Sequence, residues 1–183
     1  MNINAADWAN PVLHFWFHEL TAKDWFTASS ELDQTITDRF LETHQSLARQ
    51  SAAQIIESEQ TAVAGIIIFD QFSRNMFRGS SDAFAYDKRA LNLAKLAIKQ
   101  QHHLNLNPDE QQFLYMPFMH SEQLDDQAQS VAFFSQLNKP EHALEHQAII
   151  EQFGRFPHRN ESLGRSSTAA EKEYLKDARR FGQ

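Results

Sequence analysis

The chain has no cysteine among its 183 residues, and this absence excludes several kinds of chemistry at once. Disulfide bonds, thiolate metal ligands and a cysteine nucleophile are all ruled out. Any reaction or binding site must therefore use histidine, carboxylate, arginine or serine side chains. Glycine and proline are also scarce, with five of each. Since so little material is left for long loops, the composition predicts long helices joined by short connections.

Long apolar runs are missing as well. The longest, Ala62 to Phe69, is less than half of the roughly 20 residues that a membrane-spanning helix requires. The first ten residues carry Asp7 and no lysine or arginine, unlike a secretory signal. We therefore expect a cytoplasmic protein with no membrane partner.

Positive charge is in the minority, and the formal net charge is −7. A negative chain repels the phosphate backbone, so nucleic acid is not the expected partner. A hydrophobic fraction of 42%, with 15 phenylalanines and 3 tryptophans, is instead typical of a folded core. No linker rich in proline, glycine or serine divides the sequence. We expect one domain over residues 1–183.

Apolar periodicity predicts an all-α fold. The run from Thr61 to Phe72 is compatible with a buried strand or a buried helix, and we predict a helix because no other segment offers a strand partner. Other helices are indicated by capping residues and turn signals. The predicted segments are Asn10 to Leu20, Leu32 to Leu47, Thr61 to Phe72, Ser81 to Gln101, a helix opened by Asn107-Pro108, Ser121 to Leu137, Pro140 to Phe153 before Gly154, and Thr168 to about Arg180.

The first polar segment that could carry chemistry follows this apolar run. On a helix, Asp70 and Arg74 are adjacent on one face, and Arg78 lies one turn further on if the helix continues. Charges on a buried helix must be paired or must serve a site. We therefore predict either an ion pair that ties two helices together or a binding site.

The second segment is His120-Ser121-Glu122, which follows an aromatic stretch interrupted by Pro117. Adjacent residues rarely reach the geometry of a nucleophile and its base, so Ser121 is better interpreted as a helix N-cap. His120 with Glu122 is a candidate acid–base or ligand-orienting pair, because a neighbouring carboxylate can move a histidine pKa across neutrality.

The third segment has the densest polar chemistry and precedes a helix N-terminus. Guanidinium groups beside helix amides and hydroxyls are typical of a carboxylate or phosphate site. The alternative is that they satisfy carbonyl groups at helix ends. The candidates here are Arg155, His158, Arg159, Asn160 and Arg165.

A metal-site pattern occurs at His142-Ala-Leu-Glu145-His146, which matches the H-x-x-E-H zinc-protease motif. The match is short, and His14 and His18 show the same spacing. We interpret it as coincidence and predict no metal and no cofactor. Phe15, Trp16 and Phe17 are similarly expected in the core.

The ordered motifs together resemble a bacterial family catalogued as domain of unknown function 924. The resemblance spans nearly the whole chain, with Ser73 and Gln152 standing where the family usually has Pro and Arg. It implies a compact tetratricopeptide-like α-α superhelix of about seven to eight helices and no established activity. The motifs that carry it are Phe15-Trp16-Phe17, Asp70-Gln71-Phe72, Arg74-Asn75, Phe77-Arg78-Gly79, Ala83-Phe84-Ala85, Asp87, Phe113 to Phe118, His120-Ser121-Glu122, Gln127, Ser130, His146, Phe153 to Asn160, Leu163-Gly164-Arg165 and Ser167-Thr168.

Three functions stay open at this point. The first is a binding protein that holds a small anionic ligand or peptide on its arginines. The second is a hydrolase or transferase acting on an anionic substrate, with acid–base chemistry from His120, Glu122, His146 or His158. The third is a structural or protein-interaction domain whose polar residues only fasten helices together.

Overall fold

The computed structural model describes residues 5–177, and every regular element in that range is helical. The all-α prediction is confirmed for this range. In chain order the elements are α1 (Ala5–His14), η1 (Phe15–Glu19), η2 (Asp24–Phe26), α2 (Ser30–Leu47), α3 (Ala52–Ile55), α4 (Glu59–Ile66), η3 (Ile67–Phe72), α5 (Ser73–Met76), η4 (Ser81–Phe84), α6 (Asp87–Lys99), η5 (His102–Asn105), α7 (Pro108–Met119), α8 (Leu124–Gln136), α9 (Glu141–Phe153), η6 (Pro157–Arg159) and α10 (Ala169–Asp177).

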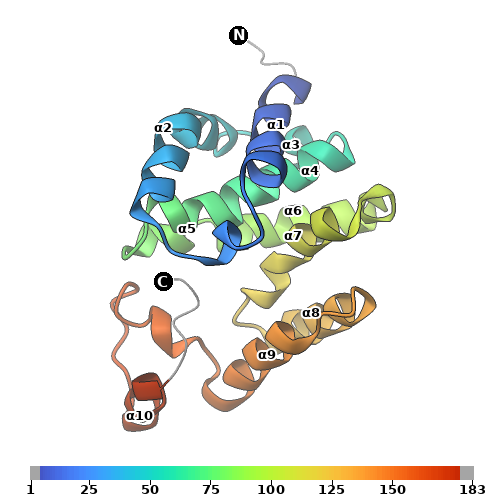
Figure 1. Cartoon of the computed structure of the whole chain (residues 1–183). Helices are drawn as coiled ribbons and strands as arrows, with labels where there is room; N and C mark the ends of the chain where they lie inside the picture. Colours follow the sequence, from blue (N-terminus) through green and yellow to red (C-terminus); the bar gives the residue numbers. More distant parts are fainter. Residues whose placement is uncertain (1–4, 178–183) are drawn as a thin grey trace.

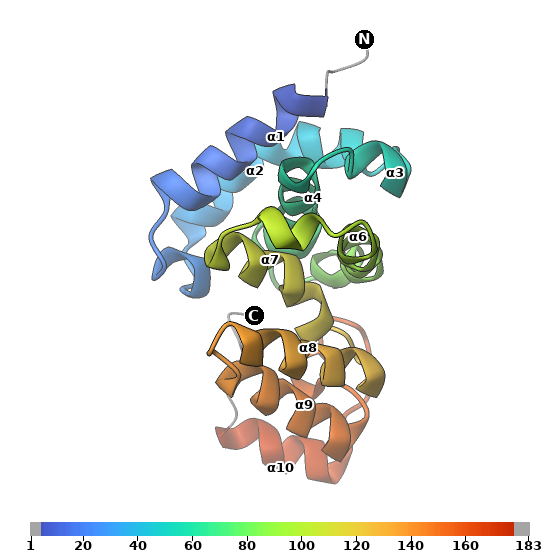
Figure 2. The same cartoon turned by 90° about the vertical axis from the view of Figure 1, so that its right-hand side faces the viewer.

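The helices are arranged around α4 and α7. Helices α1, α6 and α7 all pack against α4, and α2 packs against α5 (Figure 1). Helix α8 packs against α7 and α9 against α8, and α10 lies beyond α9 at the far end of the molecule (Figure 2). Helix α7 therefore connects the N-terminal group of helices to the C-terminal group.

The buried apolar side chains form two clusters, and the larger one extends from the N-terminal group of helices to Phe134 of α8 and Ala143 of α9. The larger cluster is centred on aromatic rings, with Trp16 lying 5.6 Å from Phe72 and 5.3 Å from Phe113 between ring centroids. This confirms the expectation that Trp16 belongs to the core. A smaller cluster, formed by Ile149, Ile150 and Phe156, packs with Phe153 and with Tyr174 of α10.

Several local signals act as the sequence predicts. Asn107 and Glu110 form a reciprocal capping box at the start of α7. Thr168 and Glu171 do the same before α10. Gly154 ends α9 at φ 68°, a left-handed conformation that favours glycine. The predicted extension of the last helix to Arg180 lies outside the described residues.

Three predicted helix starts are wrong. Asn10-Pro11 does not begin a helix, because α1 starts at Ala5 and contains Pro11. The helix continues through proline because Val12 is fully buried in the core, and such packing outweighs a local breaker. Ser81 begins a short 3₁₀ turn rather than α6. Ser121 is not the N-cap of α8, which is Gln123; its Oγ donates to Asp126 instead.

The helices within residues 5–177 are too short or too polar to cross a bilayer. The single domain over residues 1–183 and the tetratricopeptide-like arrangement stay predictions.

Candidate functional site

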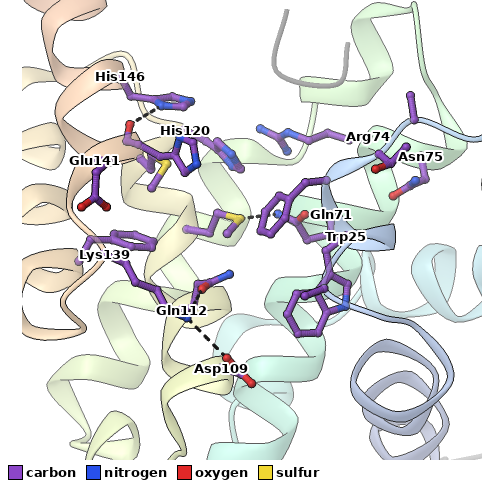
Figure 3. A pocket seen from close by; sticks show the side chains of 18 of the residues that line it. Trp25, Gln71, Arg74, Asn75, Asp109, Gln112, His120, Lys139, Glu141 and His146 are labelled. Atoms are coloured by element: carbon purple, nitrogen blue, oxygen red, sulfur yellow. Dashed lines mark hydrogen bonds and ion pairs between the residues drawn. The ribbon is translucent and has the colours of Figure 1, made fainter. Parts of the chain in front are cut away.

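A cavity of about 610 Å³ opens where the N-terminal group of helices meets α8 and α9. Figure 3 shows side chains from both groups facing each other across it. The lining comes from the segment around η2, from η3 and α5, from α7, and from α8 and α9. The lining residues are Ala22, Trp25, Phe26, Thr27, Ala28, Gln71, Arg74, Asn75, Arg78, Asp109, Gln112, Met116, Met119, His120, Phe134, Lys139, Glu141, His142 and His146.

The most specific feature of this cavity is an aspartate–histidine pair. His120 Nδ1 lies 2.8 Å from Oδ1 and 3.0 Å from Oδ2 of Asp70, which is fully buried. Burial alone would raise the pKa of Asp70, but His120, Arg74 and a hydrogen bond from Gln71 lower it to about 2. The carboxylate is therefore ionised at neutral pH and can only accept, so Nδ1–H of His120 is the donor.

The second nitrogen of His120 is thereby left as an acceptor. Burial and the charge of Arg74 lower the pKa of His120, although Asp70 acts in the opposite direction. The ring is neutral at neutral pH, with the Nε2 lone pair available. No hydrogen-bond partner of Nε2 lies within residues 5–177. The ring belongs to the lining of the cavity, and 15% of the side chain is exposed.

The backbone places Asp70 through an unusual element. Residues Ile67–Phe72 form a π-helical segment between α4 and α5, a local widening that often accompanies functional sites. Ser73 N–H donates to the Ile68 carbonyl oxygen, five residues back. The sequence predicts the helix but gives no sign of this winding. His120 lies at the other side of the contact, immediately after the last residue of α7.

Arg74 belongs to a buried ion network behind this pair. Its guanidinium contacts the backbone oxygen of Asp70 and lies 3.4 Å from Oδ1 of that residue. It also lies 3.0 Å from Asp87 Oδ1. The predicted Asp70–Arg74 pair is thus present. Asp87 is shared with Arg159, whose Nη1 is 3.1 Å from Oδ2 and whose guanidinium stacks on Phe156 at 4.5 Å.

The pKa of Arg159 shows how enclosed the network is. Burial lowers it to about 10, with Asp87 opposing the decrease and Arg74 adding to it. Arg159 therefore stays charged at neutral pH. The two buried guanidinium groups share the carboxylate of Asp87, and Arg74 has Asp70 as a second partner.

The remaining candidates from the third segment do not reach the cavity. Arg155 pairs with Glu171 at 2.6 Å. Arg165 binds Glu122 through two hydrogen bonds of 2.8 and 3.0 Å, and its Nε donates to Asn160. This corrects the predicted pairing of His120 with Glu122. Glu122 also accepts from the backbone N–H of Phe156, so it holds the loop after α9 against the start of α8.

Of the other predicted site residues, two line the cavity and one does not. Arg78 lines the cavity but lies beyond the end of α5, and its Nε donates to Asp33 at 2.6 Å. His146 also lines the cavity, with its ring 6.3 Å from that of His120. His158 lies beside the network, and burial lowers its pKa to about 3.

The zinc-protease pattern on α9 makes local contacts. His146 Nδ1 donates to the carbonyl oxygen of His142, and His142 lies 3.3 Å from Glu145. Within residues 5–177, no three histidine, aspartate or glutamate side chains gather as metal ligands.

Several lining residues were missed by sequence reasoning. Trp25, Phe26 and Lys139 lie between the predicted helices. Nothing in those segments signals a cavity, because they come together only through packing. Gln71 of the lining and Asp87 behind it had a signal, since both stand in the motifs that carry the family resemblance. Gln71 donates to Asp70 at 2.5 Å and contacts the Met116 sulfur.

Buried histidines make stability depend on pH. Burial lowers the pKa of His44 to about 4 and that of His146 to about 3. The unfolded chain, with ordinary histidine pKa values near 6.5, binds more protons below that pH. We expect the free energy of unfolding to fall as pH decreases from 6.5 towards 4, by at most about 1.4 kcal/mol per pH unit for each histidine.

Denaturant unfolding at several pH values checks this expectation. His44→Gln and His146→Gln should each flatten the slope between pH 6.5 and 4.5. The exposed His18 supplies the control, since His18→Gln should leave the slope unchanged. Equal slopes in all four proteins would contradict the prediction.

Comparison with known proteins gives a family and a structural relative. The family model described as "Bacterial protein of unknown function (DUF924)" matches residues 12–179. A solved structure of a protein of unknown function, ATU0120 from Agrobacterium tumefaciens, is similar at 33% identity with a TM-score of 0.90. The similarity covers 96% of this chain and 100% of that one. No curated protein matches the chain.

Proposed function

The chain belongs to DUF924, a family of bacterial proteins of unknown function, and we propose that it binds a small anionic ligand in the cavity beside His120. The observation that carries this proposal is the distribution of charge in the lining. Arg74 is nearly buried and Arg78 is half-buried, whereas the lining carboxylates Asp109 and Glu141 are exposed. The guanidinium groups thus lie deeper than the lining carboxylates, and the exposed Lys139 lies 3.7 Å from Asp109.

The carboxylates that neutralise these arginines support the same arrangement. Asp33, Asp70 and Asp87 pair with Arg78 or Arg74, yet within the described residues they are not part of the lining. They stabilise the guanidinium groups from behind. Arginine presents a planar fork of donors, which suits a carboxylate or phosphate oxygen.

The apolar part of the lining indicates what the rest of the ligand is like. Trp25, Met116, Met119 and Phe134 offer aromatic and thioether surface. The volume of about 610 Å³ falls within the range of small-molecule sites. We infer a small organic anion with an apolar portion that packs on these side chains.

Lys139 allows a test that leaves the buried network intact. Its side chain is 51% exposed and its amino group lies 3.2 Å from Gln112, at the cavity wall. A library of aromatic and aliphatic carboxylates and phosphate monoesters, screened by thermal shift, should yield ligands that raise the melting temperature. For these, Lys139→Gln should weaken Kd about tenfold, since a charge-assisted hydrogen bond contributes about 1.5–3 kcal/mol.

The matched control is Lys99→Gln, an exposed lysine on α6 outside the lining. It should leave Kd unchanged in calorimetric titration. The proposal fails if no anion in the library binds, or if neutral analogues bind as tightly as the anions.

A further inference from the structure

The pair formed by Asp70 and His120 has a geometry that ligand binding alone does not require. The carboxylate is sealed from solvent and holds one ring nitrogen, while the other nitrogen is left without a partner in residues 5–177. A buried carboxylate oriented in this way sets both the direction and the tautomer of the imidazole. Such an arrangement prepares Nε2 to remove a proton from a bound O–H group.

A cationic group lies beside the same carboxylate. Arg74 Nη1 and His120 Nδ1 both approach Oδ1 of Asp70, at 3.4 and 2.8 Å. In Figure 3 the Arg74 side chain extends towards His120 from the opposite wall. A guanidinium next to a base can stabilise the negative charge that develops on a carbonyl oxygen under attack.

Within the described residues, the lining offers one hydroxyl side chain that could supply the attacking O–H group. Thr27 is the lining residue with a hydroxyl, and that hydroxyl donates to the carbonyl oxygen of Lys23. Water therefore supplies the nucleophile. We propose that the protein hydrolyses a carboxylic ester that carries a second, anionic group, with His120 as general base; this rests on the proposed anion-binding function.

The reaction balances without any further reactant. His120 Nε2 accepts a proton from water as the water oxygen forms a bond to the ester carbonyl carbon. The bond from that carbon to the alcohol oxygen then breaks, and the protonated Nε2 returns its proton to the leaving alcohol. The products are one alcohol and one carboxylic acid. Asp70 acts as a positioning residue, because it touches His120 rather than the substrate.

The substrate class can be tested with chromogenic esters. The p-nitrophenyl monoester of glutaric acid carries the required carboxylate, and p-nitrophenyl butyrate is its neutral counterpart. We expect saturable hydrolysis with a higher kcat/KM for the anionic ester. His120→Gln should reduce kcat/KM by at least about 100-fold, the usual contribution of a general base. His18→Gln, an exposed histidine outside the cavity, should retain the activity.

The pH dependence of kcat distinguishes a role of Asp70 in positioning His120 from a purely structural role. The titratable and charged groups that face His120 are Asp70 from η3, Arg74 from α5, His146 from α9, and His158 and Arg159 from η6. In Asp70→Asn the negative partner is lost, so protonation of His120 becomes less favourable. The acid limb of the kcat profile should move to lower pH, and kcat should fall while KM changes little.

A measurement on the unmodified protein guards against variants that fail to fold. In ¹⁵N-labelled protein at neutral pH, the His120 resonances should show a protonated Nδ1 and an unprotonated Nε2. The opposite tautomer, or an imidazolium, overturns the proposal. So does the absence of hydrolysis of either ester, or hydrolysis that His120→Gln leaves intact. If anions bind but neither ester is hydrolysed, the acid–base role of His120 is wrong and the proposed anion site is unaffected. If anions do not bind and neither ester is hydrolysed, the proposed function is wrong as well.

Discussion

Asp87→Asn should lower the free energy of unfolding by about 3–5 kcal/mol, the cost of leaving buried charges without their partner. Oδ2 of Asp87 accepts hydrogen bonds from Arg74 and Arg159, and Oδ1 lies 3.0 Å from Arg74 Nη1. The side chains of these arginines are only 10% and 7% exposed, so water cannot replace the carboxylate. Asparagine keeps the size of the side chain but removes the charge that offsets two neighbouring guanidinium groups.

Denaturant unfolding of wild type and variant measures this loss directly. Glu173→Gln is the matched control, because its ion pair with Lys176 is solvent-exposed and such pairs contribute about 0–1 kcal/mol. Removing one cation as well, in the double variant Asp87→Asn with Arg159→Gln, should recover part of the stability. If Asp87→Asn costs no more than Glu173→Gln, the network does not stabilise the fold.

Phe72→Ala should cost a similar amount, about 3–5 kcal/mol, through a cavity in the aromatic core. The ring is fully buried, with its centroid 4.9 Å from Phe40, 5.6 Å from Trp16 and 6.0 Å from Phe15. Phe72 also ends the π-helical segment that places Asp70. Its loss should therefore weaken ligand binding in the cavity as well as stability.

Phe26→Ala provides the comparison for the core variant. Phe26 is 61% exposed, so its truncation should change the free energy of unfolding by less than about 1 kcal/mol. Thermal and denaturant unfolding of the two variants should differ clearly. Equal losses would mean that the ring of Phe72 is not a central part of the core.

The positions of the helices depend largely on signals between near neighbours, and the sequence predicts most of them. The capping box of Asn107 with Glu110 and the left-handed Gly154 operate within one helical turn. The wrong start at Asn10-Pro11 shows where this fails. There, burial of Val12 in a core made by distant segments outweighs a local stop signal.

Signals between near neighbours predict only part of the candidate site. Asp70 with Arg74 is an i, i+4 pair and was predicted from spacing alone. The spacing does not predict which carboxylate orients His120. The sequence favours Glu122, two positions away, but the end of α7 directs His120 towards η3 while Glu122 binds Arg165, 43 residues further on.

Composition and local pattern thus determined a helical chain without thiol chemistry, together with the segments in which polar side chains gather. Tertiary structure alone decided which of those side chains meet. It joins Asp70 to His120 across 50 residues and Asp87 to Arg159 across 72, and it leaves Arg155 and Arg165 to fasten the C-terminal helices. The physical reason is that caps and turns involve residues within about four positions, whereas partners of buried charges are selected by packing of the whole core.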